Sequence, residues 1–205
     1  MTTASSPRRI GAESSKTRAQ LLDAAEQLLL EEGYAGVTSR RVAAKAGLKP
    51  QLVHYYFRAM DDLFLAVFRR GAEHNLERQA RALASPQPLW ALWEFNNEPA
   101  GTTLTMEFAA LANRRPAIRD EIASYAERFR KQEAEALDRV FRTYGIDRDE
   151  LPPTAALIVM SSIPRILLIE AALGVRTGHA ETVALVERYL TRLEGQRQPR
   201  STPSR

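Results

Sequence analysis

Cysteine is absent from this chain of 205 residues. The absence excludes disulfide bridges, thiolate metal sites and cysteine nucleophiles. Histidine is scarce, and His54, His74 and His179 stand apart from one another and from paired carboxylates. Because metal sites need several ligands at close spacing, we expect neither a metal nor another cofactor.

Sequence signatures of common enzyme sites are missing as well. There is no glycine-rich phosphate loop, no G-x-S-x-G nucleophile elbow and no H-E-x-x-H zinc motif. Glu107 and Glu170 lie in apolar segments, where a buried carboxylate can be catalytic. Neither has a recognisable set of partners, and pairing with an arginine, such as Arg165 near Glu170, is the commoner arrangement. We therefore expect no enzymatic activity.

No apolar run is long and uninterrupted enough to favour a membrane span. The most apolar segment, residues 155–175, contains Pro164, Arg165, Glu170 and a pair of serines. The N-terminal residues include arginines with no apolar run after them, which is not the pattern of a secretory signal. We expect a soluble, cytoplasmic protein.

Positive charge is concentrated in the first third of the chain. Residues 1–60 carry nine Lys or Arg against five Asp or Glu, whereas residues 61–205 carry twenty of each. A basic segment attracts polyanions in a salt-sensitive manner, although a solvated basic tail has the same composition.

The hydrophobic pattern is helical throughout, with no strand-like alternation bounded by hairpin signals. The chain is therefore predicted to be all-α, with about nine helices. Basic residues 1–14 and the Arg- and Pro-containing residues 196–205 are predicted to be disordered. The predicted helices span residues 17–32, 39–46, 50–57, 60–83, 88–96, 102–114, 116–144, 153–174 and 179–194.

Local signals set the ends of the first three helices. Thr17 followed by Gln20 resembles a capping box at the start of the first. Thr38 is placed to cap the second helix, and Gly47 to end it. Pro50 suits the first position of the third helix, because its missing N–H leaves no bond unmade there.

The third helix has two contrasting faces. Val53, Tyr56 and Phe57 share one face by their spacing and should anchor the helix. A two-turn helix anchored in this way, after a three-residue connection, is typical of the second half of a helix-turn-helix, here at about residues 37–57. The opposite face carries side-chain types that reach DNA bases and phosphates: Pro50, Gln51, His54 and Tyr55.

With these features the chain resembles the tetracycline-repressor (TetR) family of transcriptional regulators over roughly residues 15–70. The resemblance implies a homodimer, a DNA-binding domain at 15–60 and an effector-binding and dimerisation domain at 61–195, with double-stranded operator DNA released when a small molecule binds. A ligand-independent architectural DNA-binding protein is the alternative. The resemblance rests on Ala24, Ala25, Gly33, Thr38, Val42, Ala43, Ala46, Gly47, Tyr56 and Phe57 at the family's spacing.

The resemblance assigns DNA contacts residue by residue. Base-reading positions fall on Arg40, Pro50, Gln51 and His54. Phosphate contacts fall on Thr38 and Tyr55, while Lys49 stands at the recognition-helix N-terminus, where it meets phosphate or a base edge. The family's phosphate-binding lysine at the start of the fourth helix is replaced by Met60, so we look for a substitute among Arg58, Arg8, Arg9, Lys16 and Arg18.

The family's ligand pocket and dimer surface are placed less specifically. An apolar pocket for a lipophilic effector of unknown identity is expected among the middle helices, where Pro164 interrupts helical bonding. The dimer surface is expected on helices 153–174 and 179–194, two from each subunit forming a four-helix bundle. The pocket candidates are Trp90, Trp93, Phe95, Met106, Phe108, Tyr125, Phe129, Met160, Ser161 and Ser162.

Overall fold

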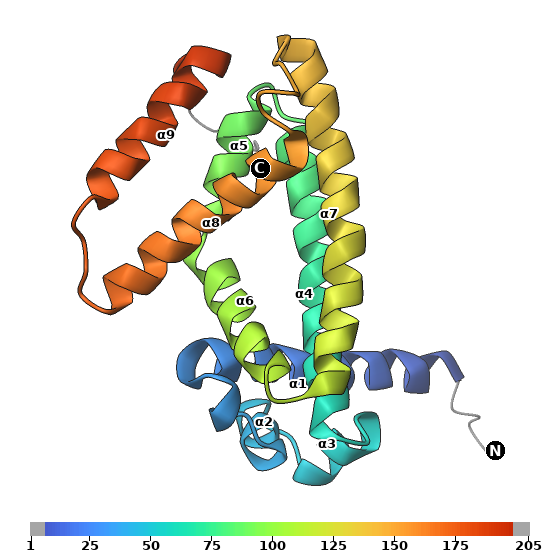
Figure 1. Cartoon of the computed structure of the whole chain (residues 1–205). Helices are drawn as coiled ribbons and strands as arrows, with labels where there is room; N and C mark the ends of the chain where they lie inside the picture. Colours follow the sequence, from blue (N-terminus) through green and yellow to red (C-terminus); the bar gives the residue numbers. More distant parts are fainter. Residues whose placement is uncertain (1–6, 199–205) are drawn as a thin grey trace, which may run out of the picture. The chain divides into compact units, whose positions relative to one another are not determined.

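A computed structural model describes residues 7–198, with side chains from residue 16 onward (Figure 1). Nine α-helices and one 3-10 turn, η1, form within these residues, which contain no strand. The all-α prediction is confirmed. In order, the elements are α1 (Pro7–Glu32), η1 (Tyr34–Gly36), α2 (Ser39–Lys45), α3 (Pro50–Tyr56), α4 (Met60–Leu83), α5 (Pro88–Asn96), α6 (Pro99–Ala112), α7 (Pro116–Tyr144), α8 (Pro153–Ala172) and α9 (His179–Glu194).

Several predicted helix ends differ from the observed ones. Helix α1 already begins at Pro7, so Thr17 lies inside a helix and is not its cap. Helix α6 begins at Pro99 because proline's fixed φ suits a first helical turn. Helix α8 continues through Pro164 and ends at Ala172, shortly before Gly174 with φ +83°. Helices α4, α5, α7 and α9 have the predicted bounds.

The chain divides into two compact units. One consists of Met1–Glu73 and Thr103–Ala123, and the other of His74–Thr102 and Ser124–Arg205. Helices α4, α6 and α7 each contribute residues to both. The division into a DNA-binding domain at 15–60 and an effector-binding and dimerisation domain at 61–195 stays a prediction, because the two units are defined by their compactness and not by their function.

The core of the first unit combines residues of the early helices with residues from much later in the chain. Val53 and Phe57 anchor α3 there, and Phe64 on α4 is fully buried. Phe108 and Leu111 of α6 belong to this same core. The remaining fully buried members include Leu21, Leu29, Val42, Leu63 and Ile118.

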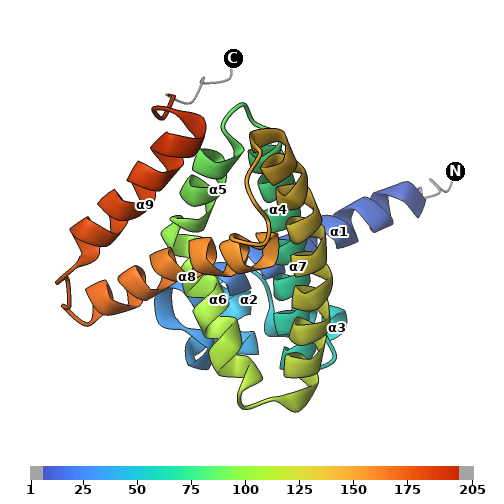
Figure 2. The ribbon, with the colours of Figure 1, turned by 45° about the horizontal axis from the view of Figure 1, so that its top comes forward.

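The second unit is built around the short helix α5. Leu89, Trp90, Leu92 and Trp93 are buried on it, so most of its surface is covered. Helix α5 packs against α8 and α9, an arrangement visible in Figure 2. The rest of this core comes from Leu137, Phe141, Ala156, Leu157 and Leu190.

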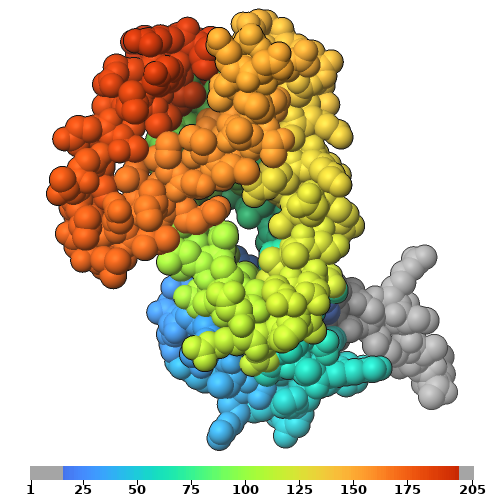
Figure 3. All heavy atoms as spheres, in the orientation of Figure 1, coloured from blue at the N-terminus to red at the C-terminus, as the bar shows by residue number. Residues whose placement is uncertain are grey.

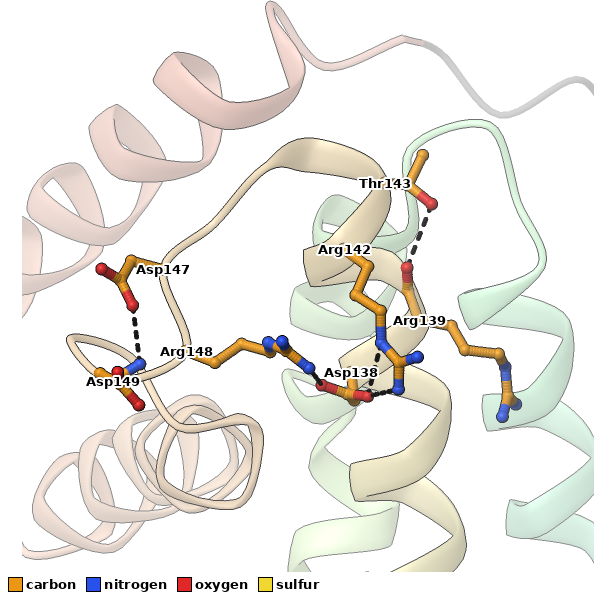
Figure 4. A network of polar contacts seen from close by, with 7 residues as sticks. All are labelled: Asp138, Arg139, Arg142, Thr143, Asp147, Arg148 and Asp149. Atoms are coloured by element: carbon orange, nitrogen blue, oxygen red, sulfur yellow. Dashed lines mark hydrogen bonds and ion pairs between the residues drawn. The ribbon is translucent and has the colours of Figure 1, made fainter.

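The turn from α7 to α8 is held by an exposed polar network (Figure 4). Asp138 accepts hydrogen bonds from Arg142 Nε at 2.9 Å and from Arg148 Nη1 at 3.1 Å. These two guanidinium groups, Arg142 first, lower the pKa of the Asp138 carboxyl. Asp147 Oδ1 accepts from the backbone N–H of Asp149 at 2.8 Å, which shapes the turn itself. The network therefore ties the end of α7 to the connecting loop.

Helices α8 and α9 leave large apolar side chains uncovered. By length and composition α8 could cross a membrane, and it is the one such helix in the part of the chain that the structure describes. Only 17% of its most apolar window is buried. Figure 3 shows α8, in orange, at the surface along its length. The exposed apolar residues of this region are Ile158, Val159, Ile166, Leu173, Val175, Leu185, Tyr189 and Leu193.

Candidate nucleic-acid interface

Helix α2 begins at the predicted cap. Thr38 is extended, and its Oγ1 accepts a long hydrogen bond, 3.4 Å, from the backbone N–H of Arg41. Val37 just before the cap and Val42 in the next turn are both buried, which fixes the direction in which the chain enters the helix. The capping prediction for Thr38 is confirmed.

The turn between α2 and α3 is closed by backbone hydrogen bonds. The N–H of Leu48 donates to Ala43 O at 2.8 Å, and that of Gly47 donates to Ala44 O at 3.1 Å. This paired pattern ends a helix with one left-handed residue, and Gly47 has φ +68°. Because a side chain is strained at that angle, glycine suits the position. The turn therefore sets the angle at which Pro50 starts α3.

Helix α3 is anchored on one face and open on the other. Val53 and Phe57 are buried, and the guanidinium of Arg18 lies over the Phe57 ring at 5.3 Å. The outward face has no such cover, and the Tyr55 side chain is 77% exposed. All seven predicted DNA-contact residues are exposed: Thr38, Arg40, Lys49, Pro50, Gln51, His54 and Tyr55.

The basic residues around this face fall into two groups. Arg41 pairs with Glu32, and Lys45 Nζ lies 2.6 Å from Glu31 Oε2, so both cations are held by the end of α1. In the described residues, no ion pair involves Arg40 or Lys49. The neighbours Arg40 and Arg41 therefore differ: Arg41 is paired with Glu32, whereas Arg40 has no ion pair within the described residues.

Met60 stands where the family has a phosphate-binding lysine, and its surroundings are apolar on one side. Met60 packs against the core of the first unit, and the Asp62 carboxylate caps α4 by accepting from the Ala59 N–H at 3.1 Å. Arg58 is exposed beside it, whereas Arg18 is engaged with Phe57. Lys16 is also exposed. The side chains of Arg8 and Arg9 lie outside the described residues.

Sequence reasoning missed a carboxylate that supports the helix-turn-helix. Glu107 Oε2 on α6 accepts a 2.7 Å hydrogen bond from the backbone N–H of Tyr34, and no arginine among the described residues pairs with it. At neighbouring Gly33, with φ +73°, a Cβ would stand 3.0 Å from that oxygen. Similarly, Glu170 pairs with His179 Nε2 at 2.8 Å and not with Arg165. Only the isolated glycine before a turn hinted at the close approach of Glu107.

The predicted pocket residues are distributed over both units. Trp90 and Trp93 are only 5% and 4% exposed in the core of the second unit, and Met160 packs against that core. Phe108 belongs to the first unit's core, while Met106 on the same helix is exposed. Tyr125, Phe129 and Ser161 are partly exposed, and Ser161 Oγ donates to Ile158 O at 3.1 Å.

A cleft of about 510 Å³ lies within the second unit. It is formed by the end of α4, by α5 and by the residues that follow α9. Of the predicted pocket residues, Trp90 and Phe95 line it. Its mixture of charged and aromatic walls differs from the apolar pocket expected from sequence. Its lining consists of Arg78, Arg81, Ala82, Ser85, Pro86, Gln87, Trp90, Ala91, Glu94, Phe95, Arg197 and Gln198.

Known sequences resemble the N-terminal part of the chain. The profile described as "Bacterial regulatory proteins, tetR family" matches residues 21–67. The transcriptional regulator BetI of Brucella anthropi is 39% identical over 61 residues, which are 30% of this chain and 31% of BetI. The transcriptional repressor BepR of Brucella suis is 32% identical over 87 residues, 42% of each chain. The match therefore spans less than half of either relative.

Solved structures resemble most of the chain. A transcriptional regulator from Saccharomonospora viridis, solved in complex with choline, has a TM-score of 0.69 at 21% identity and covers 87% of this chain and 96% of its own. A TetR-family member from Streptomyces coelicolor has a TM-score of 0.61 at 26% identity, covering 86% and 97%. The multidrug binding protein EbrR, complexed with imidazole, has 0.57 at 25%, covering 91% and 97%. Residues 21–67 thus match the TetR family of bacterial regulatory proteins, and the fold of most of the chain is similar to that of a TetR-family member.

Proposed function

We propose that the protein is a cytoplasmic transcriptional regulator that binds a palindromic DNA operator as a homodimer. The observation that carries the proposal is the two-faced helix α3. Its inner face is fixed by Val53 and Phe57, while Gln51, His54 and Tyr55 stand exposed on the other side. A rigid helix with open polar side chains is what major-groove reading requires.

Each exposed group has a defined partner in this proposal. The Gln51 amide pairs with adenine N6 and N7, and the Arg40 guanidinium with guanine O6 and N7. Pro50 and His54 contact base edges beside them. Thr38, Lys49 and Tyr55 bind phosphates or, for Lys49, a base edge, and so set the orientation of the helix. These assignments supply both the reading and the positioning contacts of one half-site.

A second copy of the chain is the proposed cover for α8 and α9. Their exposed apolar side chains, such as Ile166 and Leu185, are unfavourable in water and would pack in a four-helix bundle. A twofold dimer would present two copies of α3, one for each half-site of a palindrome. Dimerisation and operator recognition are therefore parts of one proposal.

Release by a small molecule is the proposed regulatory step. The second unit has its own core and a cleft large enough for a small ligand. EbrR and the Saccharomonospora viridis regulator were solved with small molecules, which supports a ligand-responsive second unit here. Helix α4 is continuous from Met60, just after α3, to Leu83 near the cleft. A ligand that displaces α4 would alter the spacing of the two α3 helices.

Selection from random duplex DNA with the purified full-length chain tests the DNA-binding role. We expect enrichment of a palindrome whose half-sites have centres about one helical turn apart. Binding that is strong but without base preference would instead favour the architectural protein. No binding to duplex DNA at low salt would reject both readings.

A further inference from the structure

The cleft of the second unit has a wall made by the residues that follow α9. The Glu194 carboxylate accepts hydrogen bonds from the backbone N–H of Leu89 at 2.8 Å and from that of Trp90 at 2.9 Å. It also accepts a hydrogen bond from Tyr144 Oη at 2.8 Å. Burial, followed by the contact with Glu194, raises the pKa of Tyr144 to about 12. The start of α5 is therefore joined to the end of α9 by charge-assisted hydrogen bonds.

Gln87 forms hydrogen bonds with the backbone of residues 194–198 in this wall. Its Nε2 donates to Glu194 O at 3.1 Å and to Gln196 O at 2.8 Å, and its Oε1 accepts from the Gln198 N–H at 2.8 Å. The Trp90 indole N–H donates to Gly195 O at 3.1 Å. Residues 194–198, placed by sequence partly in a disordered tail, are thus bonded along their length, while residues 199–205 lie outside the described part.

The cleft carries an excess of positive charge. Arg197 is paired with Glu94 at 2.5 Å, and the Glu94 side chain is only 14% exposed. Arg78 pairs with Glu98 and lies over the Phe95 ring at 5.3 Å. Arg81 donates to the carbonyl of Glu77 on its own helix at 3.3 Å and has no ion pair within the described residues. Its charge is available to a ligand.

Apolar and hydrogen-bonding groups complete the lining. Trp90 and Phe95 provide aromatic surface between the arginines. Ser85 Oγ is buried and lacks a hydrogen-bond partner among the described residues. An unsatisfied buried hydroxyl is uncommon in folded proteins, and a ligand oxygen can supply its partner. The walls thus combine guanidinium, aromatic and hydroxyl groups in one concavity.

We propose that this cleft binds a small amphipathic carboxylate, with its anionic end at Arg81 and its apolar part against Phe95 and Trp90. Charge complementarity favours this class, because a quaternary cation would meet three arginines and a single carboxylate that is already paired. The volume of about 510 Å³ suits a molecule of one aromatic ring and a short chain. Only the regulatory consequence of binding rests on the proposed function.

Calorimetry on the full-length protein tests the site with three probes: 4-phenylbutyrate, its uncharged amide and choline. We expect the carboxylate to bind at least about tenfold more tightly than the amide, since a hydrogen bond to a charged group is lost. Choline should not bind detectably. Equal binding of acid and amide, or tighter binding of choline, would overturn the proposal.

Two arginine variants separate a local from a general charge effect. Arg81→Gln should weaken 4-phenylbutyrate binding by about tenfold or more, and Arg81→Lys should recover part of it. Arg139→Gln removes the same charge from α7 outside the cleft and should leave binding unchanged. Equal losses in Arg81→Gln and Arg139→Gln would show that net charge alone attracts the probe, and the site would be rejected.

The tryptophans provide a positional readout. Trp90 lines the cleft and Trp93 does not, so the fluorescence response to 4-phenylbutyrate should persist in Trp93→Phe and vanish in Trp90→Phe. Thermal melts check that both variants fold. If the carboxylate binds as expected but leaves operator affinity unchanged, the site stands and its regulatory role fails. If DNA selection succeeds while no probe binds, the cleft proposal fails and the proposed function stands.

Discussion

Glu107 on α6 holds the backbone N–H of Tyr34, 73 residues earlier in the chain, by a hydrogen bond of 2.7 Å. The bond joins α6 to the connection between α1 and α2, within the first compact unit. A residue outside the helix-turn-helix thus positions the segment that leads into it.

Removal of this acceptor should weaken the first unit. In Glu107→Ala the Tyr34 N–H loses its partner, and we expect the free energy of unfolding to fall by about 1–3 kcal/mol. Glu107→Gln keeps an acceptor oxygen and should lose less. Denaturant titration measures both, and operator affinity should fall in the same order. An Ala variant as stable as the parent protein would contradict the assigned role.

Base reading should depend on Gln51 and Arg40 separately. Gln51→Ala and Arg40→Ala should each cost about 1–3 kcal/mol on the preferred operator and relax base preference at one position per half-site. Tyr55→Phe should weaken all sequences alike. Arg41→Ala is the matched control, because Arg41 pairs with Glu32, and its selected motif should stay unchanged. An unaltered motif with Gln51→Ala would mean that α3 is oriented differently on DNA.

Self-association should depend on α8. Sedimentation at micromolar concentration should give twice the 23.0 kDa chain mass. Ile166→Glu places a charge on the exposed apolar face and should shift the protein to monomer, since an unpaired buried charge is costly. Leu151→Glu introduces the same charge at an exposed leucine outside α8 and α9, and this variant should remain a dimer. Monomer formation in both variants would point to general instability instead.

Glu133 should make stability depend on pH near neutrality. Burial raises its pKa to about 7, although a hydrogen bond with Gln79 and the charge of Arg130 oppose the rise. The native state therefore retains a proton that the unfolded chain loses above about pH 4.5, so stability falls as pH rises from there to about 7. The full effect is at most roughly 3 kcal/mol.

A neutral amide isolates this contribution. Glu133→Gln should flatten the pH dependence between about pH 5 and 7, measured by denaturant titration at each pH. Glu135→Gln, on the exposed face of the same helix, should keep the slope of the parent protein. A Glu133→Gln variant with an unchanged slope would assign the pH dependence to other groups.

Short-range signals were sufficient to predict the helix-turn-helix. Thr38, Gly47 and Pro50 act on bonds within a few residues of themselves, so their effects can be inferred from local sequence. Proline at the start of α5, α7 and α8 fixed those ends for the same reason. The pairing of Arg41 with Glu32 was not predictable, because it depends on how the end of α1 lies against α2.

Long-range contacts determined what the sequence could not reveal. Gln87 meets residues more than 100 positions later, and no periodic pattern relates helix α5 to the end of α9. The cleft lining therefore escaped prediction, apart from Trp90 and Phe95. Apolar and aromatic residues such as Trp93 and Phe108 carry the same signal whether they fill a core or line a pocket, and here both are buried in cores.

The core of the first unit also bears on how the chain folds during synthesis. Phe108, Leu111 and Ile118 complete that core, so the segment up to Glu73 emerges from the ribosome without part of its own interior. Domains generally fold as units once their residues are available. The helix-turn-helix should therefore reach its stable form only after about fifty further residues have been translated, and an excised fragment of residues 1–73 should fold poorly by itself.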